Sequence, residues 1–132
     1  MSKKWTHTAA FQFYGTEPRN PMWSWSARSE DPKTVVVTLW KDELIGRAGK
    51  MVCARSNRGD WHDGPGYRHF MEDLTWAQEN CDGLVRVIVA THRIEDGQRR
   101  IDECYPQQNL FMKVSAADPA TGAFTLEQVV RS

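Results

Sequence analysis

Tryptophan and arginine occur together in two segments of the chain, residues 19–28 and 57–68. The first, RNPMWSWSAR, places Trp23 and Trp25 between two arginines, and the second holds Trp61 in the glycine-rich stretch NRGDWHDG. Side chains two residues apart in extended backbone project to the same side, so Trp23 and Trp25 are predicted to form one wall. Aromatic rings interleaved with arginine are how proteins stack on bases and bind the neighbouring phosphates. The predicted ligand-binding residues are Trp23, Trp25, Trp61, Arg28, Arg55, Arg58 and His62.

A second interpretation of the tryptophans is that they fill the core. Tryptophan buries a large apolar body, although its N–H still needs a partner. Trp40 ends an expected core strand and Trp76 lies in an expected helix, so both are predicted to be core residues. For Trp23 and Trp25 the sequence leaves two roles open, which are packing against the end of the sheet and facing a ligand.

The loop DWHDG is the best place in the chain for acid–base chemistry. Asp60, His62 and Asp63, with His69 nearby, have the groups for a histidine–carboxylate pair or a loose metal site, although solvated loop residues are the alternative. Phosphate loops of the GxGxxG or Walker type, a GxSxG elbow and the zinc-deaminase pattern are all absent from the sequence. We therefore expect no catalytic residue, no metal ligand and no cofactor. The alternative is a small enzyme that acts on a nucleotide-like substrate through this loop.

The charges balance, since 17 basic and 17 acidic side chains leave no net charge. This balance argues against a protein that bulk electrostatics holds on nucleic acid, and a protein-interaction module is a further alternative. The distribution is less even, because residues 1–28 and 44–69 each carry a net charge of +3. Arginine, the residue suited to bidentate phosphate contacts, outnumbers lysine 11 to 6.

Length and cysteine usage predict a single cytoplasmic domain. A chain of 132 residues is long enough for one hydrophobic core. Its 3 cysteines are widely spaced with no CxxC pair, which is typical of reduced thiols rather than of disulfides or a structural zinc site. No apolar segment follows the first lysines as in a signal peptide, and no apolar run is long enough to cross a bilayer. We expect no membrane partner.

Hydrophobic patterning predicts an α+β fold with five or six strands and one main helix at residues 67–81. Phe70, Leu74, Ala77 and Cys81 form one apolar stripe along that helix. Strands do not alternate regularly with helices, so a mostly antiparallel sheet that curls toward a pseudo-barrel, with the helix against one opening, is expected. The expected strands are residues 10–15, 34–40, 50–56, 84–94, 109–118 and 122–130, with a short helical turn at 100–108.

In the order and size of these segments the chain resembles the PUA-like superfamily. The segments are AFQFYG, TVVVTLW, KMVCARS, the helix YRHFMEDLTWAQENC, LVRVIVATHRI and NLFMKVS. This superfamily of small pseudo-barrels includes the ASCH, EVE, YTH and SRA domains, and its members hold RNA or a flipped modified base in a pocket lined by aromatic residues. The resemblance covers roughly residues 10–130 and carries over no functional residue by motif. Together with the tryptophan–arginine pattern, it implies a non-enzymatic module that binds RNA or DNA, or a modified base.

Overall fold

The computed structural model describes residues 5–18, 24–30, 33–47, 50–55, 65–118 and 120–129. Within these ranges it does not describe the side chains of residues 47, 50, 55, 65–67, 98–100 and 109. In chain order the elements are α1 (His7–Phe13), β1 (Ser26–Glu30), β2 (Lys33–Trp40), the 3-10 helix η1 (Lys41–Glu43), β3 (Ile45–Arg47), β4 (Lys50–Arg55), α2 (Pro65–Asn80), β5 (Leu84–Glu95), β6 (Gln98–Asp118) and β7 (Ala123–Gln128).

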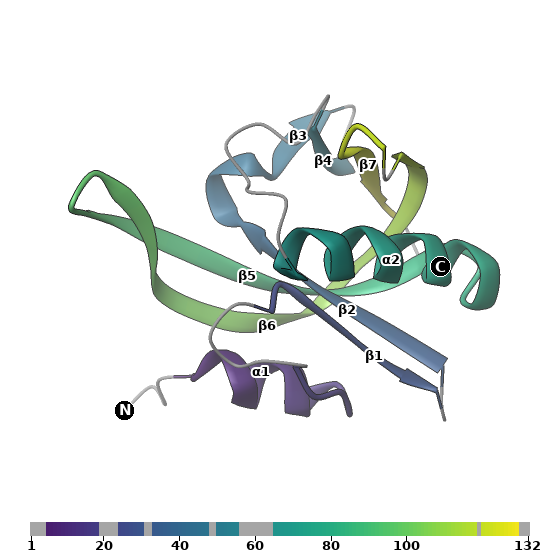
Figure 1. The fold of residues 1–132 in the computed structure, drawn as a ribbon, viewed down its shortest axis with the longest axis horizontal. Helices are drawn as coiled ribbons and strands as arrows, with labels where there is room; N and C mark the ends of the chain where they lie inside the picture. Colours follow the sequence, from purple (N-terminus) through teal and green to yellow (C-terminus); the bar gives the residue numbers. More distant parts are fainter. Residues whose placement is uncertain are drawn as a thin grey trace.

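The strands form one seven-stranded sheet in the order β1-β2-β5-β6-β7-β4-β3. All neighbouring pairs are antiparallel except β2 and β5, which run parallel. Between these two parallel strands the chain passes through β3, β4 and α2 (Figure 1). The fold is therefore α+β with a mixed, mostly antiparallel sheet.

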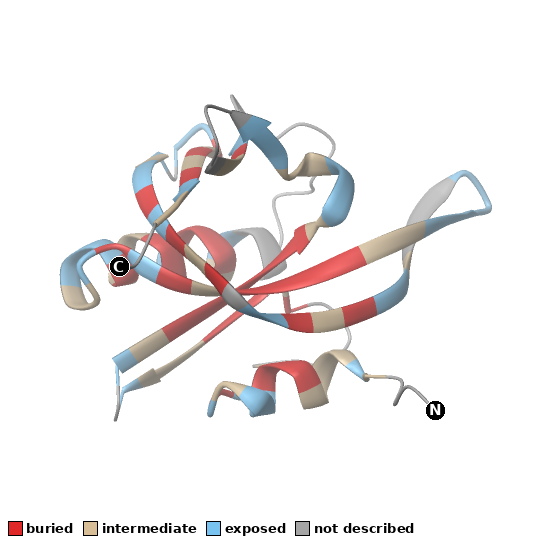
Figure 2. Ribbon diagram, turned by 180° about the vertical axis from the view of Figure 1, so that it is seen from behind, coloured by how far each residue is buried: buried red, intermediate tan, exposed pale blue. Residues whose placement is uncertain are grey.

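Both faces of β2, the second strand of the sheet, are covered. Val35, Val37 and Leu39 pack in one core cluster with residues of α2, whereas Val36, on the opposite face, packs with Phe11 of α1. Alternate side chains of a strand point to opposite faces, so a strand buried on both faces needs a continuous apolar run. The sequence TVVVTLW supplies that run, and Figure 2 shows buried residues along the central strands and on both helices.

The second half of the sheet curls around α2. Cys53 of β4 and Phe124 of β7 share the core cluster with Phe70 and Leu74 of α2. The rings of Phe70 and Phe124 lie 5.3 Å apart between centroids. Apolar side chains of α2 thus pack against the inner face of the curled part of the sheet.

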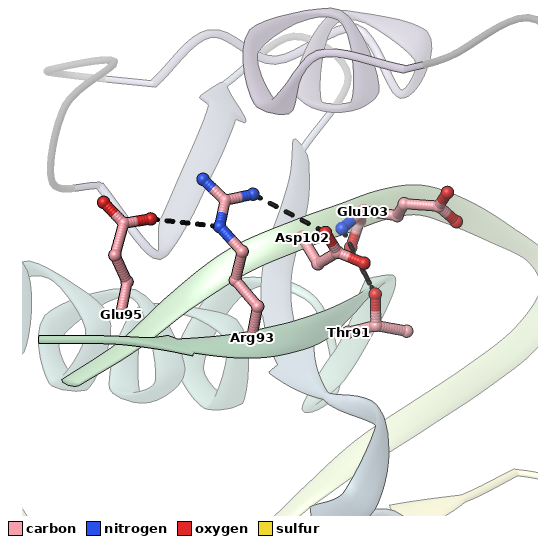
Figure 3. A network of polar contacts seen from close by, with 5 residues as sticks. All are labelled: Thr91, Arg93, Glu95, Asp102 and Glu103. Atoms are coloured by element: carbon pink, nitrogen blue, oxygen red, sulfur yellow. Dashed lines mark hydrogen bonds and ion pairs between the residues drawn. The ribbon is translucent and has the colours of Figure 1, made fainter. Parts of the chain in front are cut away.

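The ends of β5 and β6 project from the sheet as a two-stranded arm (Figure 1). Arg93 lies at the centre of a surface network on the arm, with Nε 3.1 Å from Glu95 Oε2 and Nη1 3.5 Å from Asp102 Oδ1 (Figure 3). The backbone N–H of Glu103 donates to Thr91 Oγ1 at 3.2 Å in the same network. Within the arm, the contacts of Arg93 with Asp102 and of Glu103 with Thr91 thus join β5 to β6.

Two sequence predictions of local structure are wrong. Residues 10–15 do not form a strand, because α1 ends in this stretch and Gly15 follows it with φ of 80°. Thr6 caps this helix by accepting the Ala9 N–H at 3.0 Å, and Ala10 and Phe11 are buried against the sheet. Residues 100–108 form part of β6 rather than a helical turn.

The main helix and the curled, mostly antiparallel sheet are confirmed, with α2 at Pro65–Asn80. The strand count is seven rather than five or six, since β1 and β3 were not predicted. The sheet is also open rather than closed: it begins at β1 and ends at β3, and the described residues of these two strands do not pair with each other.

Gly83 ends α2 at a close approach to β6, and replacing it should destabilise the fold. Its φ is 79°, and an added Cβ would lie 3.1 Å from Lys113 Cγ and 3.3 Å from the Val114 carbonyl oxygen. We expect Gly83→Ala to lower the free energy of unfolding by about 2 kcal/mol or more. The left-handed backbone conformation alone costs an L-amino acid with a Cβ roughly 1–2 kcal/mol, and the close contacts add to this. Gly97, with φ of 76° and nothing within 4 Å, is the matched control. Urea denaturation should show a larger loss for Gly83→Ala than for Gly97→Ala, and equal losses would contradict the close approach.

Candidate functional site

Most of the predicted ligand-binding residues lie outside the described part of the chain. This holds for Trp23, Arg58, Trp61 and His62, as well as for Asp60 and Asp63 of the acid–base loop. The backbone of Arg55 ends β4, but its side chain is not described. The structure therefore places two of the predicted side chains, Trp25 and Arg28.

Arg28 lies where β1 packs on α2. Its guanidinium carbon is 5.1 Å from the centre of the Trp76 ring, and its Nη1 is 3.8 Å from Asp73 Oδ1. The side chain of Arg28 is 31% exposed, whereas that of Asp73 is fully buried at 0%. Ser26 Oγ donates to Asp73 Oδ2 at 2.5 Å, so the buried carboxylate is bound from β1 by both a hydroxyl and a cation. A buried charge needs such partners, and Asp73 thereby fixes α2 to β1.

The two elements that meet at this junction are those that follow, along the chain, the two segments that the sequence assigns to the pocket. Residues 19–23 lead into Ser24 and then β1, and residues 56–64 lead directly into α2. Because β1 and α2 pack on each other through Asp73, the two segments connect to neighbouring elements. The structure thus brings together the elements that carry the predicted segments, without describing the segments themselves.

Trp25 is half-buried in a row of rings beside β1, and it also packs against the core cluster that contains residues of α2. Its ring centroid is 5.0 Å from that of Trp40 and 6.1 Å from that of His7. Trp25 contacts α1 and β2, whereas Arg28 contacts α2, so among the described contacts these two predicted residues do not meet. Trp40 and Trp76 pack against the core as predicted, but each remains partly exposed.

A separate hollow of about 480 Å³ lies at the C-terminal end of α1, on the face of the sheet opposite α2. A bulge in β6 forms part of it: Arg86 pairs with Phe111 and Ile88 with Pro106, so Val87 of β5 faces four residues of β6, numbers 107–110. Bulges re-aim side chains and often lie beside functional sites. The hollow is lined by Phe13, Tyr14, Thr34, Arg86 and Gln108.

Sequence reasoning did not find this hollow. The one available signal was Arg86, a charged residue among the apolar residues of LVRVIVA, together with the polar stretch QQN after Pro106. Among the described residues, no three or more His, Cys, Asp or Glu side chains lie together so as to bind a metal ion. In the described part of the chain, no helix has the length and apolar character needed to span a membrane.

Comparison with protein-family models, with curated protein sequences and with solved structures finds no match to this chain.

Replacing Asp73 should destabilise the junction. We expect Asp73→Ala to lower the free energy of unfolding by about 3 kcal/mol, because the buried Ser26 hydroxyl loses its acceptor and a cavity replaces the buried carboxylate. Ser26→Ala should cost about 2 kcal/mol, because hydrogen bonds to charged groups are worth about 1.5–3 kcal/mol. Glu72, an exposed acid beside Asp73 on α2, is the matched control, and Glu72→Ala should change stability by less than about 0.5 kcal/mol. Equal urea midpoints for the Asp73 and Glu72 variants would contradict the role given to Asp73.

His7 should make stability depend on pH. Its Nε2 lies 2.7 Å from Thr38 Oγ1, and burial lowers the pKa of His7 from 6.5 to about 4. Between these two pH values the unfolded chain binds a proton that the folded chain does not, so stability falls as the pH drops from 6.5 to about 4. His7→Gln keeps a polar partner for Thr38 but removes this titration. From pH 7.5 to pH 4.5 the wild type should lose about 2 kcal/mol more than His7→Gln in urea denaturation, and parallel losses would show that His7 is not responsible.

Proposed function

We propose that this protein is a non-enzymatic module that binds nucleic acid, or a modified base within it, beside the junction of β1 and α2. The observation that carries the proposal is the partly exposed Arg28 guanidinium over the ring of Trp76. In this function Trp23, Trp25 and Trp61 stack on bases, and Arg28, Arg55 and Arg58 bind phosphates or base edges, with His62 beside them. The PUA-like resemblance is part of the same proposal.

The bonds of Arg28 leave it capable of binding a phosphate. Its Nη1 contact with Asp73 at 3.8 Å is longer than a direct charge-assisted hydrogen bond of about 2.7–2.9 Å. A guanidinium carries five N–H donors in a fixed plane, and contact with Trp76 restrains that plane. Arg28 is thus held in position from two sides while part of its side chain stays open to solvent.

The cysteines favour a location for this module inside the cell. We place this module in the cytoplasm, where thiols stay reduced. The support is that no disulfide joins the three cysteines, Cys53, Cys81 and Cys104, all of which lie in the described part of the chain. Burial raises the pKa of both Cys81 and Cys104, which suppresses their thiolate forms.

Trp61→Ala tests the stacking role. Base–aromatic stacking is worth about 1–3 kcal/mol per base, so this change should weaken oligonucleotide binding about five- to a hundredfold. Trp61→Phe keeps a ring and should retain most of the affinity. Tryptophan fluorescence during titration with short single- and double-stranded oligonucleotides measures both, and a loss below twofold for Trp61→Ala would remove Trp61 from the site.

The same titration at low and moderate salt tests the arginine contacts. If Arg28, Arg55 and Arg58 each neutralise one phosphate of a single strand, log K should fall with log salt with a slope of about −2. Arg28→Gln should lower that slope by about 0.7, whereas Arg93→Gln on the arm, whose cation is already paired with two carboxylates, should leave it unchanged. A fluorescence signal that no oligonucleotide changes would favour a protein-interaction module. Turnover that His62→Ala abolishes without loss of affinity would favour an enzyme.

A further inference from the structure

Arg86 at the floor of the α1-side hollow has no counter-charge among the described residues. The ion pairs there give Arg28 and Arg93 carboxylate partners, but no carboxylate of the described chain lies within 4.0 Å of the Arg86 guanidinium. The side chain is nevertheless only partly exposed. A cation withdrawn from solvent without a paired anion is costly, and such a group favours an anion from outside the chain.

The rings beside Arg86 hold its guanidinium in place. Its central carbon lies 4.6 Å from the centre of the Tyr14 ring and 4.2 Å from that of Phe111. Both distances are within the range of cation–π attraction. Tyr14 is itself anchored, since its hydroxyl donates to the Val87 carbonyl oxygen at 3.1 Å. Burial raises the pKa of Tyr14 although the Arg86 charge counteracts it, so the phenol stays neutral and does not act as the missing anion.

The bulge of β6 orients the Arg86 guanidinium through one hydrogen bond, and other N–H donors of the guanidinium stay available for a ligand. Arg86 Nη2 donates to the backbone carbonyl oxygen of Gln108 at 2.9 Å, and Gln108 is one of the residues of the bulge. The buried Arg86 Nε makes no hydrogen bond to a described residue. A guanidinium has five N–H donors that match planar oxyanions in bidentate geometry. The exposed amide of Gln108 and the hydroxyl of Thr34 line the same hollow and add polar groups around the cation.

An exposed ring completes the hollow. The side chain of Phe13 is 45% exposed although it is a large apolar group, and it lines the hollow with Arg86. Phe13 also packs edge-on against Trp5 and Tyr14, at 5.6 and 5.1 Å between ring centroids. A volume of about 480 Å³ lies within the usual range of about 300–1,000 Å³ for small-molecule sites.

We propose that this hollow binds a small organic anion, a phosphate or carboxylate group carried on a flat ring. The oxyanion contacts Arg86 and the polar groups of Thr34 and Gln108, and the ring of the ligand packs on Phe13. This site lies on the face of the sheet opposite the junction of β1 and α2. It is therefore independent of the nucleic-acid site proposed there, and each can be correct without the other.

Four probes, titrated by calorimetry into the full chain, separate the contributions of charge and ring. We expect phenyl phosphate to bind best if the ligand is a phosphate, and benzoate if it is a carboxylate. Inorganic phosphate, which lacks the ring, and benzyl alcohol, which lacks the charge, should each bind at least about fivefold more weakly than the better of the two. Benzyl alcohol binding as tightly as both ring-bearing anions would overturn the proposal, and so would the absence of binding by all four at millimolar concentration.

Variants assign the binding to the hollow. Arg86→Gln should weaken the better anion about ten- to a hundredfold, the value of charge-assisted hydrogen bonds. Arg93→Gln removes the same charge from the exposed arm and should change the affinity less than twofold. Phe13→Ala should weaken the ring-bearing anion about fivefold or more while leaving inorganic phosphate unaffected. A folded Arg86→Gln protein with wild-type affinity would overturn the assignment.

Two measurements keep the test decisive if Arg86→Gln does not fold. Arg86→Lys retains the charge but loses the planar fork, so it should weaken binding severalfold. In addition, amide chemical shifts of the wild-type protein during titration should change at Tyr14, Arg86 and Gln108. Shifts confined to β1 and α2 would instead assign the anion to the other face and overturn the proposal.

Discussion

The burial of β2 on both faces is the constraint on which the rest of the molecule depends. Val35 and Val37 face α2 while Val36 faces α1, so the sheet is stable only with a helix on each side. The two helices are very different in length, since α2 is 16 residues long and α1 only 7. α2 is long enough to fill the curled half of the sheet. α1 covers only part of the other face, and the hollow with Arg86 begins where it ends.

Two charged groups at the sheet show how the same apolar packing produces different outcomes. Asp73 is fully buried, and the hydroxyl of Ser26 and the cation of Arg28 compensate it within the fold. Arg86 is contacted by two rings and one carbonyl, which orient it without supplying a negative charge. The first arrangement is complete in itself and stabilises the contact between α2 and β1. The second orients its cation but includes no negative charge from the described residues, which is the property expected of a binding group rather than of a structural one.

Local sequence patterns predicted those elements whose signal is local. The stripe of Phe70, Leu74 and Ala77 identified α2, and the run TVVVTLW identified β2 together with the burial of both its faces. The pattern AFQFY is compatible with both a strand and a helix, and a helix of seven residues is too short for its periodicity to distinguish them, so the prediction of a strand at residues 10–15 is wrong. β1 was missed because Ala27 is its only apolar residue, so its place is decided by pairing with β2. Arg86 could not be assigned a role, since its surroundings depend on a bulge in β6 and on the docking of α1.

Zero net charge therefore says little about the binding properties of this chain. What matters for a buried or half-buried charge is whether an opposite charge lies within a few ångströms of it. Dissolved salt screens such a group far less than it screens an exposed one. Arg93 shares its charge with Glu95 and Asp102 on the solvated arm, so its field is largely cancelled. Arg86 lies under aromatic rings in a hollow, where each contact with an anion is stronger than the same contact in open water. A neutral protein can thus hold a strongly anion-selective site, provided that its acidic side chains lie elsewhere on the fold.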